Sequence, residues 1–503
     1  MSDVADLPDD VEALKAMLRD AHIELRGRDL LIEKLKLQLS GMARHRFGSS
    51  AEGLQQLQLM LEDLEITRST EVPAGAPEPA SKDKPVRKPL PDHLPRIDQV
   101  LETGDACNDC GGKLKRVGED VTEELEYIPG RFMVNRYVRP RMACTCCDRF
   151  HQAPLSSRPI ERGRPGPGLL AHVLVSKYAD HLPLYRQAQI FARSGVDLDR
   201  STLAGWSGVA GYHLAPLTRR LAERLKASGH LFMDETKCPV LDPGRGKTKS
   251  GYLWALARDE RGWGGTGPPG VVYFYADGRA GSHAETFLDG FTGTLRVDAY
   301  AGYKRLARND RPGGAVVLAN CWAHARRKLV EIQKSSGSPI ADDGLKKIAE
   351  LYAIEAEIRG LDPEARRLIR RSRTAPLVAA FGDWLKQKRA RISAKSRLGE
   401  HLTYIANCWS GLQVFLHDGH VEMDSNPVEN RIRPLALGRK NHLLAGHDEG
   451  AHAWACIASL IETCKLNDVE PLGYLTATLE AIANGHPMSR LDELLPGPFA
   501  CAS

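Results

Sequence analysis

The sequence lacks any apolar run that approaches the roughly 20 residues needed to span a bilayer. It also lacks a signal peptide, because its first residues are acidic. These absences argue against a membrane or secreted protein, and we expect a cytoplasmic one, associated with the nucleoid if it binds DNA. A large net charge is missing as well. The total is +5, so a nucleic-acid partner has to be argued from local clusters of charge.

A disulfide framework is not indicated either. The 11 cysteines are an odd number and no secretory signal accompanies them, which favours metal ligands or free thiols. What the chain does have is length. With 503 residues, of which 42% are hydrophobic and 26% charged, it has an ordinary globular composition and is too long for one hydrophobic core. We expect roughly three to five domains.

Residues 1–66 are predicted to form a coiled-coil region. Over 11–42 apolar side chains recur every seven residues, and nine of the ten seam positions are apolar. The seam consists of Val11, Leu14, Leu18, Ala21, Leu25, Arg28, Ile32, Leu35, Leu39 and Met42. Such a helix pairs with another copy of the chain; the alternative is an amphipathic helix packed on its own protein. Seven prolines between 73 and 95 then predict a linker over 67–100.

Two Cys-x-x-Cys pairs predict a zinc-binding ribbon over residues 101–155. The first pair is Cys107 and Cys110, and the second, after 33 intervening residues, is Cys144 and Cys147. Each pair places two thiolates on a tight turn, which suits tetrahedral Zn²⁺ in a structural site. The stretches 123–128 and 132–139 between them are predicted strands. Cys146 is a spare thiol that could replace a neighbour as ligand, and incidental free cysteines are the alternative.

Residues 165–228 are predicted to be helical and to contain a helix-turn-helix. A first helix over 183–195 ends in glycine, and a second begins near Arg200, with Ser201 or Thr202 placed to cap it. In this motif the second helix enters the major groove, so these three residues are predicted DNA contacts. Any helical hairpin has the same pattern, and that is the alternative.

Residues 229–445 carry the element order of a ribonuclease H-like core: three strands, a helix, a strand, a helix and a strand. Strands are predicted near 230–234, 251–258, 270–276, 294–298 and 315–320. Asp234 closes the first strand and Asp298 the fourth. These two strands lie side by side in that fold, so the two carboxylates would face one another. A solvated strand end is the alternative for each acid taken alone.

A third acid is predicted at Glu429, near the start of a helix that Ser425 or Asn426 could cap. Four cations follow it without an acid: Arg431, Arg433, Arg439 and Lys440. A carboxylate next to such a run suits a site where metal meets a phosphate backbone, and the four cations are predicted DNA contacts. Two alternatives are a solvated helix in which Glu429 pairs with Arg433, and Asp424 as the third ligand. Pro434 is expected to end or kink this helix.

The three acids together predict a divalent metal site. Like charges a few ångströms apart repel one another unless a cation lies between them. Carboxylate oxygens without a histidine or cysteine set favour Mg²⁺ or Mn²⁺. Two such ions would activate the attacking oxygen and stabilise the leaving oxygen of a phosphodiester. Glu235 follows Asp234 on the strand, so its side chain should point to the opposite face, and it is left out of the site.

A helical insertion is predicted over about 325–420, between the fifth strand and the helix of Glu429. His324 precedes it and could touch substrate or serve only as a structural histidine. The basic run 386–395 could be a DNA track or a solvated face. Residues 446–503 are expected to form a helical C-terminal region. The predicted fold class is therefore multidomain α/β, with a coiled coil, zinc ribbon and helix-turn-helix before the catalytic core.

Several motifs resemble the DDE transposases of bacterial insertion sequences, of the IS-sixty-six type. They are Asp234-Glu-Thr, Asp298-Ala-Tyr-Ala-Gly-Tyr, Cys321-Trp-Ala-His-Ala-Arg-Arg and Asn426-Pro-Val-Glu-Asn-Arg-Ile-Arg-Pro-Leu-Ala-Leu-Gly-Arg-Lys-Asn441. The cysteine pairs, residues 125–132 and residues 459–467 also look like that family, so the similarity covers nearly the whole chain. The tail departs from the family pattern, because no tryptophan follows Leu494-Leu-Pro.

The resemblance implies metal-dependent cleavage at the inverted-repeat ends of an element, then joining of the freed 3′-OH to target DNA. It maps the catalytic triad onto Asp234, Asp298 and Glu429, and it implies that the same element also encodes small accessory proteins. The prediction is thus a DNA transposase that self-associates through its coiled coil. A structure-specific nuclease of the same fold, and a non-catalytic zinc-ribbon DNA-binding regulator or decayed transposase, are the rival functions.

Overall fold

A computed structural model describes residues 130, 132–143, 150–152, 157–160, 163, 165–242 and 244–500. The predicted coiled coil, the linker and the cysteines 107, 110, 144 and 147 lie outside the described residues. Residues Arg139–Ser503 belong to one compact unit and Val72–Val138 to another. Among the helices that the structure describes, none is long and apolar enough to cross a membrane.

Residues 132–139 form no strand, so that prediction was wrong. Met133 and Val134 are 80% and 85% exposed, and the apolar pattern that suggested a strand is not used for packing. The strands described nearby are β1, Met142–Ala143, and β2, Phe150–His151, which pair antiparallel with each other. Strand propensity alone does not form a strand, because a strand needs a partner for its backbone groups.

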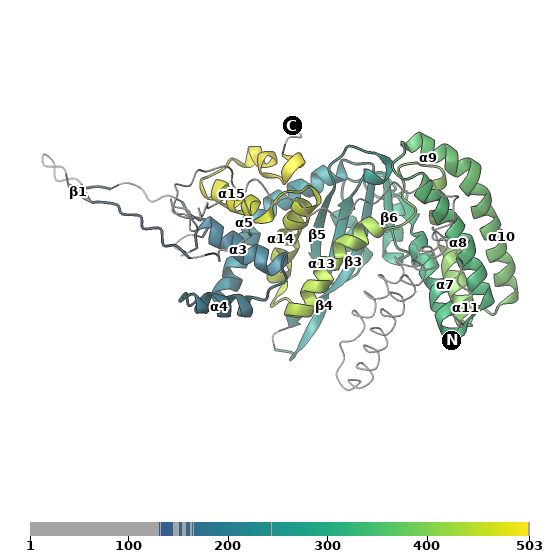
Figure 1. Ribbon diagram of the computed structural model, residues 1–503, viewed down its shortest axis with the longest axis horizontal. Helices are drawn as coiled ribbons and strands as arrows, with labels where there is room; N and C mark the ends of the chain where they lie inside the picture. Colours follow the sequence, from purple (N-terminus) through teal and green to yellow (C-terminus); the bar gives the residue numbers. More distant parts are fainter. Residues whose placement is uncertain are drawn as a thin grey trace, which may run out of the picture. The chain divides into compact units, whose positions relative to one another are not determined.

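The centre of the larger unit is a five-stranded mixed sheet, seen in Figure 1 behind the labels β3 to β6. Its strands are β3 His230–Asp242, β4 Lys247–Arg258, β5 Gly270–Ala276, β6 Thr294–Val297 and β7 Val317–Asn320. Their order is β5-β4-β3-β6-β7, with β3-β4 and β4-β5 antiparallel and β3-β6 and β6-β7 parallel. The prediction that the first and fourth strands lie side by side is confirmed, because β3 pairs with β6.

Between β5 and β6 lies α6, Gly281–Phe287, and between β6 and β7 lies a 3-10 helix, η3, Ala301–Ala307. These two elements pack on one face of the sheet. Trp254 of β4 contacts Phe287 of α6 and Tyr303 of η3 there, with ring centroids 6.2 and 6.0 Å apart. Aromatic pairs at this distance fix the two elements firmly against the sheet.

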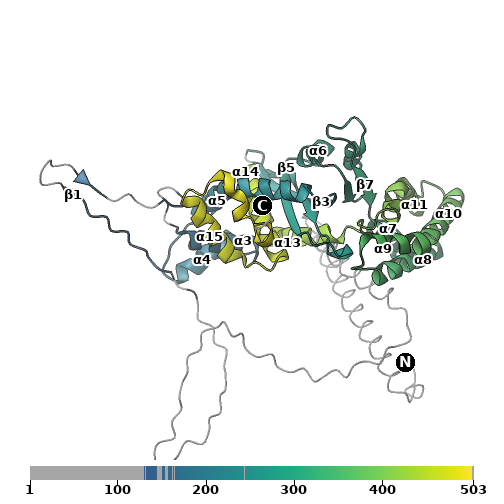
Figure 2. The same cartoon turned by 90° about the horizontal axis from the view of Figure 1, so that it is seen from above.

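The other face is covered by helices from both ends of the unit. They are α5 Arg200–Lys226, α13 Asn426–His442 and α14 Asp448–Leu466. The helices α3 Pro167–Tyr178 and α15 Pro471–Ala483 pack against α5 and α14. Short 3-10 helices, η6 Met488–Leu494 and η7 Gly497–Phe499, complete the C-terminal end. Figure 2 shows these C-terminal helices grouped with α3 and α5, so the segments before and after the sheet share one hydrophobic core.

The edge strand β5 is closed by side chains of α14. Ser459 Oγ accepts a hydrogen bond from the backbone N–H of Tyr273 at 2.8 Å, and Thr463 Oγ1 accepts one from Val271 at 3.1 Å. Asn467 Nδ2 donates to the carbonyl of Pro269 at 2.8 Å. An edge strand otherwise leaves its backbone groups unpaired, and here buried hydroxyls take the place of a sixth strand.

The predicted helix-turn-helix corresponds to α4, Leu184–Arg193, followed by α5. The cap of α5 is Asp199, not Ser201 or Thr202 as expected. Its carboxylate accepts hydrogen bonds from the Ser201 backbone N–H at 2.7 Å and from Ser201 Oγ at 2.6 Å. An aspartate at the N-cap also interacts favourably with the positive end of the helix, which explains why it takes this role.

The stretch between β7 and α13 is helical. It contains α7 Trp322–Ser336, α8 Pro339–Glu357, α9 Pro363–Ile369, the π-helix η4 Arg370–Thr374, α10 Ala375–Arg391, α11 Arg397–Asn407, α12 Trp409–Gln413 and η5 Val414–Leu416. These helices have a hydrophobic cluster of their own, built around Trp322, Phe381 and Trp409. Both figures show them as a body beside the sheet.

The helix α13 continues past Pro434, so the expected end was wrong, and a kink there stays a prediction. A proline within a helix removes one N–H donor and crowds the preceding turn, at a cost of about 3 kcal/mol. Burial of Val428 and Leu435 against the sheet core offsets this cost, because these residues lie on both sides of the proline. Tertiary packing therefore overrides the local signal.

Candidate active site

Asp234 and Asp298 occupy equivalent places on the paired strands β3 and β6. In this parallel ladder Phe232 lies beside Arg296. Two residues further along, each of the two strands reaches its aspartate. Because side chains alternate between the two faces of a sheet, residues two positions apart point to the same face. Asp298 follows the last residue of β6, and its carboxylate accepts a hydrogen bond from the Tyr300 backbone N–H at 2.8 Å. The predicted pairing of the two aspartates thus follows from the strand register.

The helix α13 lies on that same face of the sheet. Asp234 lies in a cross-strand row with Ala255 and Tyr273. The Tyr273 hydroxyl donates a hydrogen bond to the Arg431 carbonyl of α13 at 2.6 Å, which fixes the helix over this row. Glu429 is in the first turn of α13, close enough to Asp234 for its charge to act on that carboxyl group.

Asp234 is surrounded by negative charge. Burial raises the pKa of its carboxyl group well above the usual value, and the neighbouring carboxylates of Glu235, Glu429 and Asp298 raise it further. A buried acid with three acidic neighbours is destabilised in its ionised form. A cation placed among these oxygens would relieve that repulsion.

Glu429 has a different environment, because positive groups of α7 approach it. Its carboxylate accepts a hydrogen bond from Ser425 Oγ at 2.7 Å and lies 3.6 Å from His324 Nδ1 and 3.5 Å from Arg327. Burial opposes ionisation, but the charges of His324 and Arg327 outweigh it and lower the pKa of Glu429. Glu429 is only 8% exposed and yet is held as a carboxylate.

His324 also contacts Cys321 at the start of α7. Burial opposes the protonated form of His324, but the neighbouring Cys321 and Glu429 raise its pKa to about 10. Among the described residues, Cys321, His324 and Glu429 form a group whose ligand atoms lie within 4.8 Å of one another, whereas the three predicted acids do not. The structure therefore brings Glu429 to the face of the two aspartates but turns its carboxylate toward α7.

Glu235 lies on the opposite face of the sheet, as its place in the strand predicts. It pairs across the strands with Trp254, which packs on α6 and η3. Its carboxylate accepts hydrogen bonds from Arg279 and from the Tyr303 hydroxyl. Arg279 also lies within 3.8 Å of Asp298, so its positive charge interacts with the carboxylates of both Glu235 and Asp298.

Asp424, the alternative third ligand, lies one residue before the N-cap position of α13. Its carboxylate accepts hydrogen bonds from the Asn426 backbone and side-chain N–H groups, both at 3.1 Å. Burial raises the pKa of Asp424 to about 6. Ser425 stands at the N-cap position of this helix, as expected, but its hydroxyl makes no capping hydrogen bond because it donates to Glu429.

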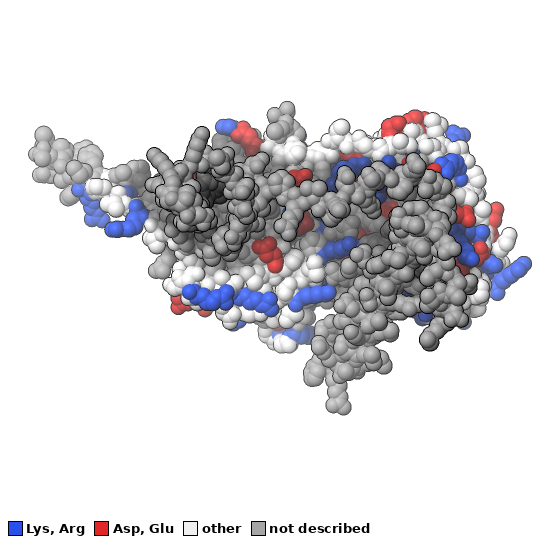
Figure 3. Space-filling model, viewed as in Figure 1, with Lys and Arg blue, Asp and Glu red and all other residues white. Residues whose placement is uncertain are grey.

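The predicted DNA contacts differ in their accessibility. Arg200, Ser201, Thr202 and Lys440 are exposed, Arg431 and Arg433 are half-buried, and Arg439 is only 6% exposed. Figure 3 shows lysine and arginine side chains along one edge of the visible face, over α4 and the C-terminal end of α13. Gly438 of α13 lies near His181, just before α4, so these two basic segments are neighbours.

The sequence prediction missed the roles of Arg327, Arg279 and Ser425. A signal for Arg327 was present, because His324 and Arg327 are three residues apart and so share one face of a helix. Nothing local indicated that this face would meet Glu429, which is more than a hundred residues away in the chain. Arg279 and Ser425 carried no sequence signal that we can identify.

Acids at neighbouring strand ends, facing a helix rich in arginine, are typical of enzymes that act on phosphodiesters. The chain belongs to the transposase IS66 family: the model of that family matches residues 162–453. The model of the zinc-finger binding domain of transposase IS66 matches residues 105–148, which contain all four predicted zinc ligands. Residues 459–496 match the IS66 C-terminal element, and 34–98 match the model described as transposase C of IS166 homeodomain.

Curated relatives span almost the full chain. Two uncharacterized proteins of Sinorhizobium fredii (strain NBRC 101917 / NGR234), y4qI and y4jD, are each 38% identical, over 99% and 97% of this chain and 98% and 96% of their own. A third, y4hP of the same organism, is 37% identical over 94% of this chain and 89% of its own. The family resemblance drawn from the motifs is thus confirmed, and the chain is a transposase with a zinc-binding domain.

Proposed function

We propose that this chain catalyses DDE-type DNA transposition. It would cleave the inverted-repeat ends of its insertion sequence and join the freed 3′-OH groups to target DNA. The observation that supports this most is the register of β3 and β6, which puts Asp234 and Asp298 side by side under the helix of Glu429. The strand order β5-β4-β3-β6-β7 supports a ribonuclease H-like assignment for this core.

The three acids offer the donor chemistry of a site for two divalent metal ions, which Asp234, Asp298 and Glu429 would hold. Their donors are hard carboxylate oxygens, which suit Mg²⁺ or Mn²⁺. Burial and, after it, the neighbouring carboxylates raise the pKa of Asp234, and a cation would relieve the repulsion between these carboxylates. The bound ions would supply activation of the attacking oxygen and stabilisation of the leaving oxygen.

Neighbouring side chains keep the third acid, Glu429, ionised and oriented. His324 and Arg327 keep Glu429 ionised although it is nearly buried, so a carboxylate is available without a change of protonation. Ser425 holds one oxygen of Glu429 and so sets the direction of the group. On the opposite face, Arg279 pairs with Glu235 and also interacts with Asp298. Neither Glu235 nor Arg279 would be a metal ligand.

DNA would lie along the basic edge that runs from α13 to the helix-turn-helix. Arg431, Arg433 and Lys440 would hold phosphates near the acids, with Arg439 behind them, and Arg200, Ser201 and Thr202 at the start of α5 would contact the element end. Contacts to phosphates position the duplex and carry no sequence information, so the base readout falls to α5 and the zinc-binding domain. The N-terminal region would join two copies, and accessory proteins of the element would assist.

The proposal is tested with labelled duplex DNA that carries the repeats flanking the gene, incubated with full-length protein and Mg²⁺ or Mn²⁺. We expect cleavage followed by strand transfer. Asp298→Ala should abolish both steps, with a loss of rate of about 10³-fold or more, and leave end binding intact. A matched control is Asp277→Ala, because Asp277 also follows a strand but its side chain is 74% exposed.

The outcomes separate the rival functions. Cleavage without joining would indicate a nuclease, and end binding without cleavage a regulator. Joining retained by Asp298→Ala would overturn the assignment of the triad. A loss of end binding in the same variant would mean that the substitution damages the fold, and Asp298→Asn, which keeps the size of the side chain, would then decide.

A further inference from the structure

A cluster of two histidines and an aspartate lies away from the three acids. His230 begins β3, and Asp418 and His420 belong to the loop between η5 and α13. His230 Nε2 is 2.8 Å from Asp418 Oδ2, and His420 Nδ1 is 2.8 Å from Asp418 Oδ1. The two imidazole rings stack with centroids 4.7 Å apart. One carboxylate thus joins two imidazoles from segments 188 residues apart.

The loop that carries Asp418 and His420 is rigidly held. The fully buried guanidinium of Arg370 donates hydrogen bonds to the carbonyls of Phe415, Asp418 and Val421, at 3.0, 3.1 and 2.9 Å. Gly419 packs so closely on α9 that a Cβ there would lie 1.7 Å from the Pro363 carbonyl oxygen. The side chains are therefore presented by a fixed backbone, which is a requirement of a preorganised ligand site.

The rings themselves are also oriented. Trp263 packs its ring edge against His420, with centroids 4.8 Å apart and planes at 79°. Asp418 Oδ1 accepts a hydrogen bond from the His420 backbone N–H at 2.9 Å, which fixes the carboxylate. Two neighbouring imidazoles and a carboxylate, each with a restrained position, resemble the donor set of a metal site more than a chance surface ion pair.

The distances suit a zinc-class ion. The ligand atoms of all three residues lie within 4.8 Å of one another. A tetrahedral zinc ion with bonds of about 2.0–2.1 Å separates its donors by about 3.3 Å, so the present 2.8 Å pairs would open by about half an ångström.

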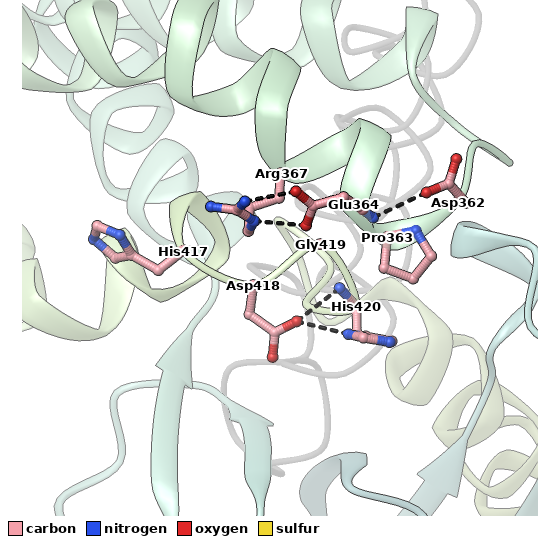
Figure 4. Close-up of a pocket in the computed structure, with 8 residues that line it drawn as sticks. All are labelled: Asp362, Pro363, Glu364, Arg367, His417, Asp418, Gly419 and His420. Carbon is pink, nitrogen blue, oxygen red and sulfur yellow. Dashed lines mark hydrogen bonds and ion pairs between the residues drawn. The ribbon is translucent and has the colours of Figure 1, made fainter.

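A pocket of about 310 Å³ opens beside this cluster, as Figure 4 shows. It is lined by Asp418 and His420 together with Pro363 and Arg367, and it gives an ion a route from solvent. Three protein ligands leave a fourth position, which water in this pocket could fill. His417 also borders the pocket, but its side chain points away from Asp418 in the same view.

We propose that His230, Asp418 and His420 bind a divalent transition-metal ion of the zinc class. This site shares no residue with the cysteine pairs of the zinc-binding domain or with the three catalytic acids, and it does not depend on the proposed function. Two imidazole nitrogens favour zinc over magnesium. The ion would tie the loop before α13 to the strand that carries Asp234, and so would fix the start of the Glu429 helix relative to β3.

The test uses full-length protein stripped with a chelator and then titrated with Zn²⁺ alone. Bound zinc per chain is measured by atomic emission, and thermal stability is followed in parallel. We expect His420→Ala and His230→Gln each to bind one zinc ion fewer per chain than the wild type, and to lose part of the rise in Tm that zinc causes. The matched control is His417→Ala, which should bind as much zinc as the wild type.

The same measurements can overturn the proposal. Equal zinc content in the wild type and in both variants would show that the cluster is only a hydrogen-bonded ion pair. Loss of zinc in His417→Ala as well would contradict the assignment of the ligands. His230→Gln retains a hydrogen-bonding side chain of similar size, so the comparison stays valid if His420→Ala folds poorly.

Discussion

At the scale of single residues, two acids of the site, Asp234 and Glu429, have pKa values shifted in opposite directions. Burial and neighbouring carboxylates raise the pKa of Asp234, whereas His324 and Arg327 lower that of Glu429 against the effect of burial. A raised pKa of an acid means that the folded state is weakened once that acid ionises. Asp234 therefore costs stability at neutral pH when no cation is bound.

Asp234→Asn should stabilise the metal-free protein and abolish catalysis. The amide removes a charge that lies among three other carboxylates, and we expect a gain of about 0.5–2 kcal/mol in the free energy of unfolding at pH 7. The gain should shrink as the pH falls below the raised pKa, because Asp234 is then neutral in the wild type as well. Denaturant unfolding with and without Mg²⁺ checks this.

Asp277→Asn is the matched control, since Asp277 is 74% exposed and should change the free energy of unfolding little. A wild type that is more stable than Asp234→Asn in chelator would contradict the electrostatic picture of the site.

His324→Gln should change the pH dependence of cleavage. Removing the cation beside Glu429 raises the pKa of that acid, so more of it is protonated at a given low pH. The acid limb of the rate profile should move to higher pH, and the rate at a fixed pH on that limb falls about tenfold when the pKa of Glu429 rises by about one. Initial rates of end cleavage are measured between about pH 5.5 and 8.5, the range in which imidazoles and perturbed carboxylates titrate.

The control is His283→Gln, because His283 pairs with Asp277 at 3.3 Å on the surface and makes the same change of residue type. An acid limb that stays in place in His324→Gln would show that Arg327 alone keeps Glu429 ionised.

At the scale of elements, the edge of β5 depends on two hydroxyl groups. Thr463→Val replaces an acceptor with a methyl group of similar shape and leaves the Val271 N–H buried without a partner. An unsatisfied buried donor costs about 1–3 kcal/mol, and we expect that loss in urea unfolding. Thr286→Val is the control, because Thr286 is in an exposed position of α6. Equal stabilities would mean that α14 holds β5 by apolar packing alone.

The positions of the strands in the sequence, and which of them lie side by side, could be predicted because each strand is a short apolar run, rich in β-branched residues and bounded by turn residues. Asp234 and Asp298 followed from this, since a parallel pair aligns the ends of both strands. Predictions that relied on a single local signal fared less well. The cap of α5, the course of α13 past Pro434 and the strand at 132–139 were all decided by packing or by a neighbouring residue.

At the scale of the whole molecule, what escaped prediction is the set of contacts between distant segments. His324 and Arg327 reach Glu429 from α7, and His230 meets Asp418 from the far end of the insertion. Neither pairing leaves a trace in the periodicity of the chain, because each depends on how distant segments pack together. The sequence therefore indicates which acids are candidate site residues, but not which neighbouring groups shift their pKa values.

The closed edge of β5 also limits how copies of this transposase can assemble. A strand whose outer N–H groups are already bonded to Ser459 and Thr463 cannot accept a strand from a second molecule. In the folded chain, extension of the sheet by another strand is thus blocked at Val271 and Tyr273 of this edge.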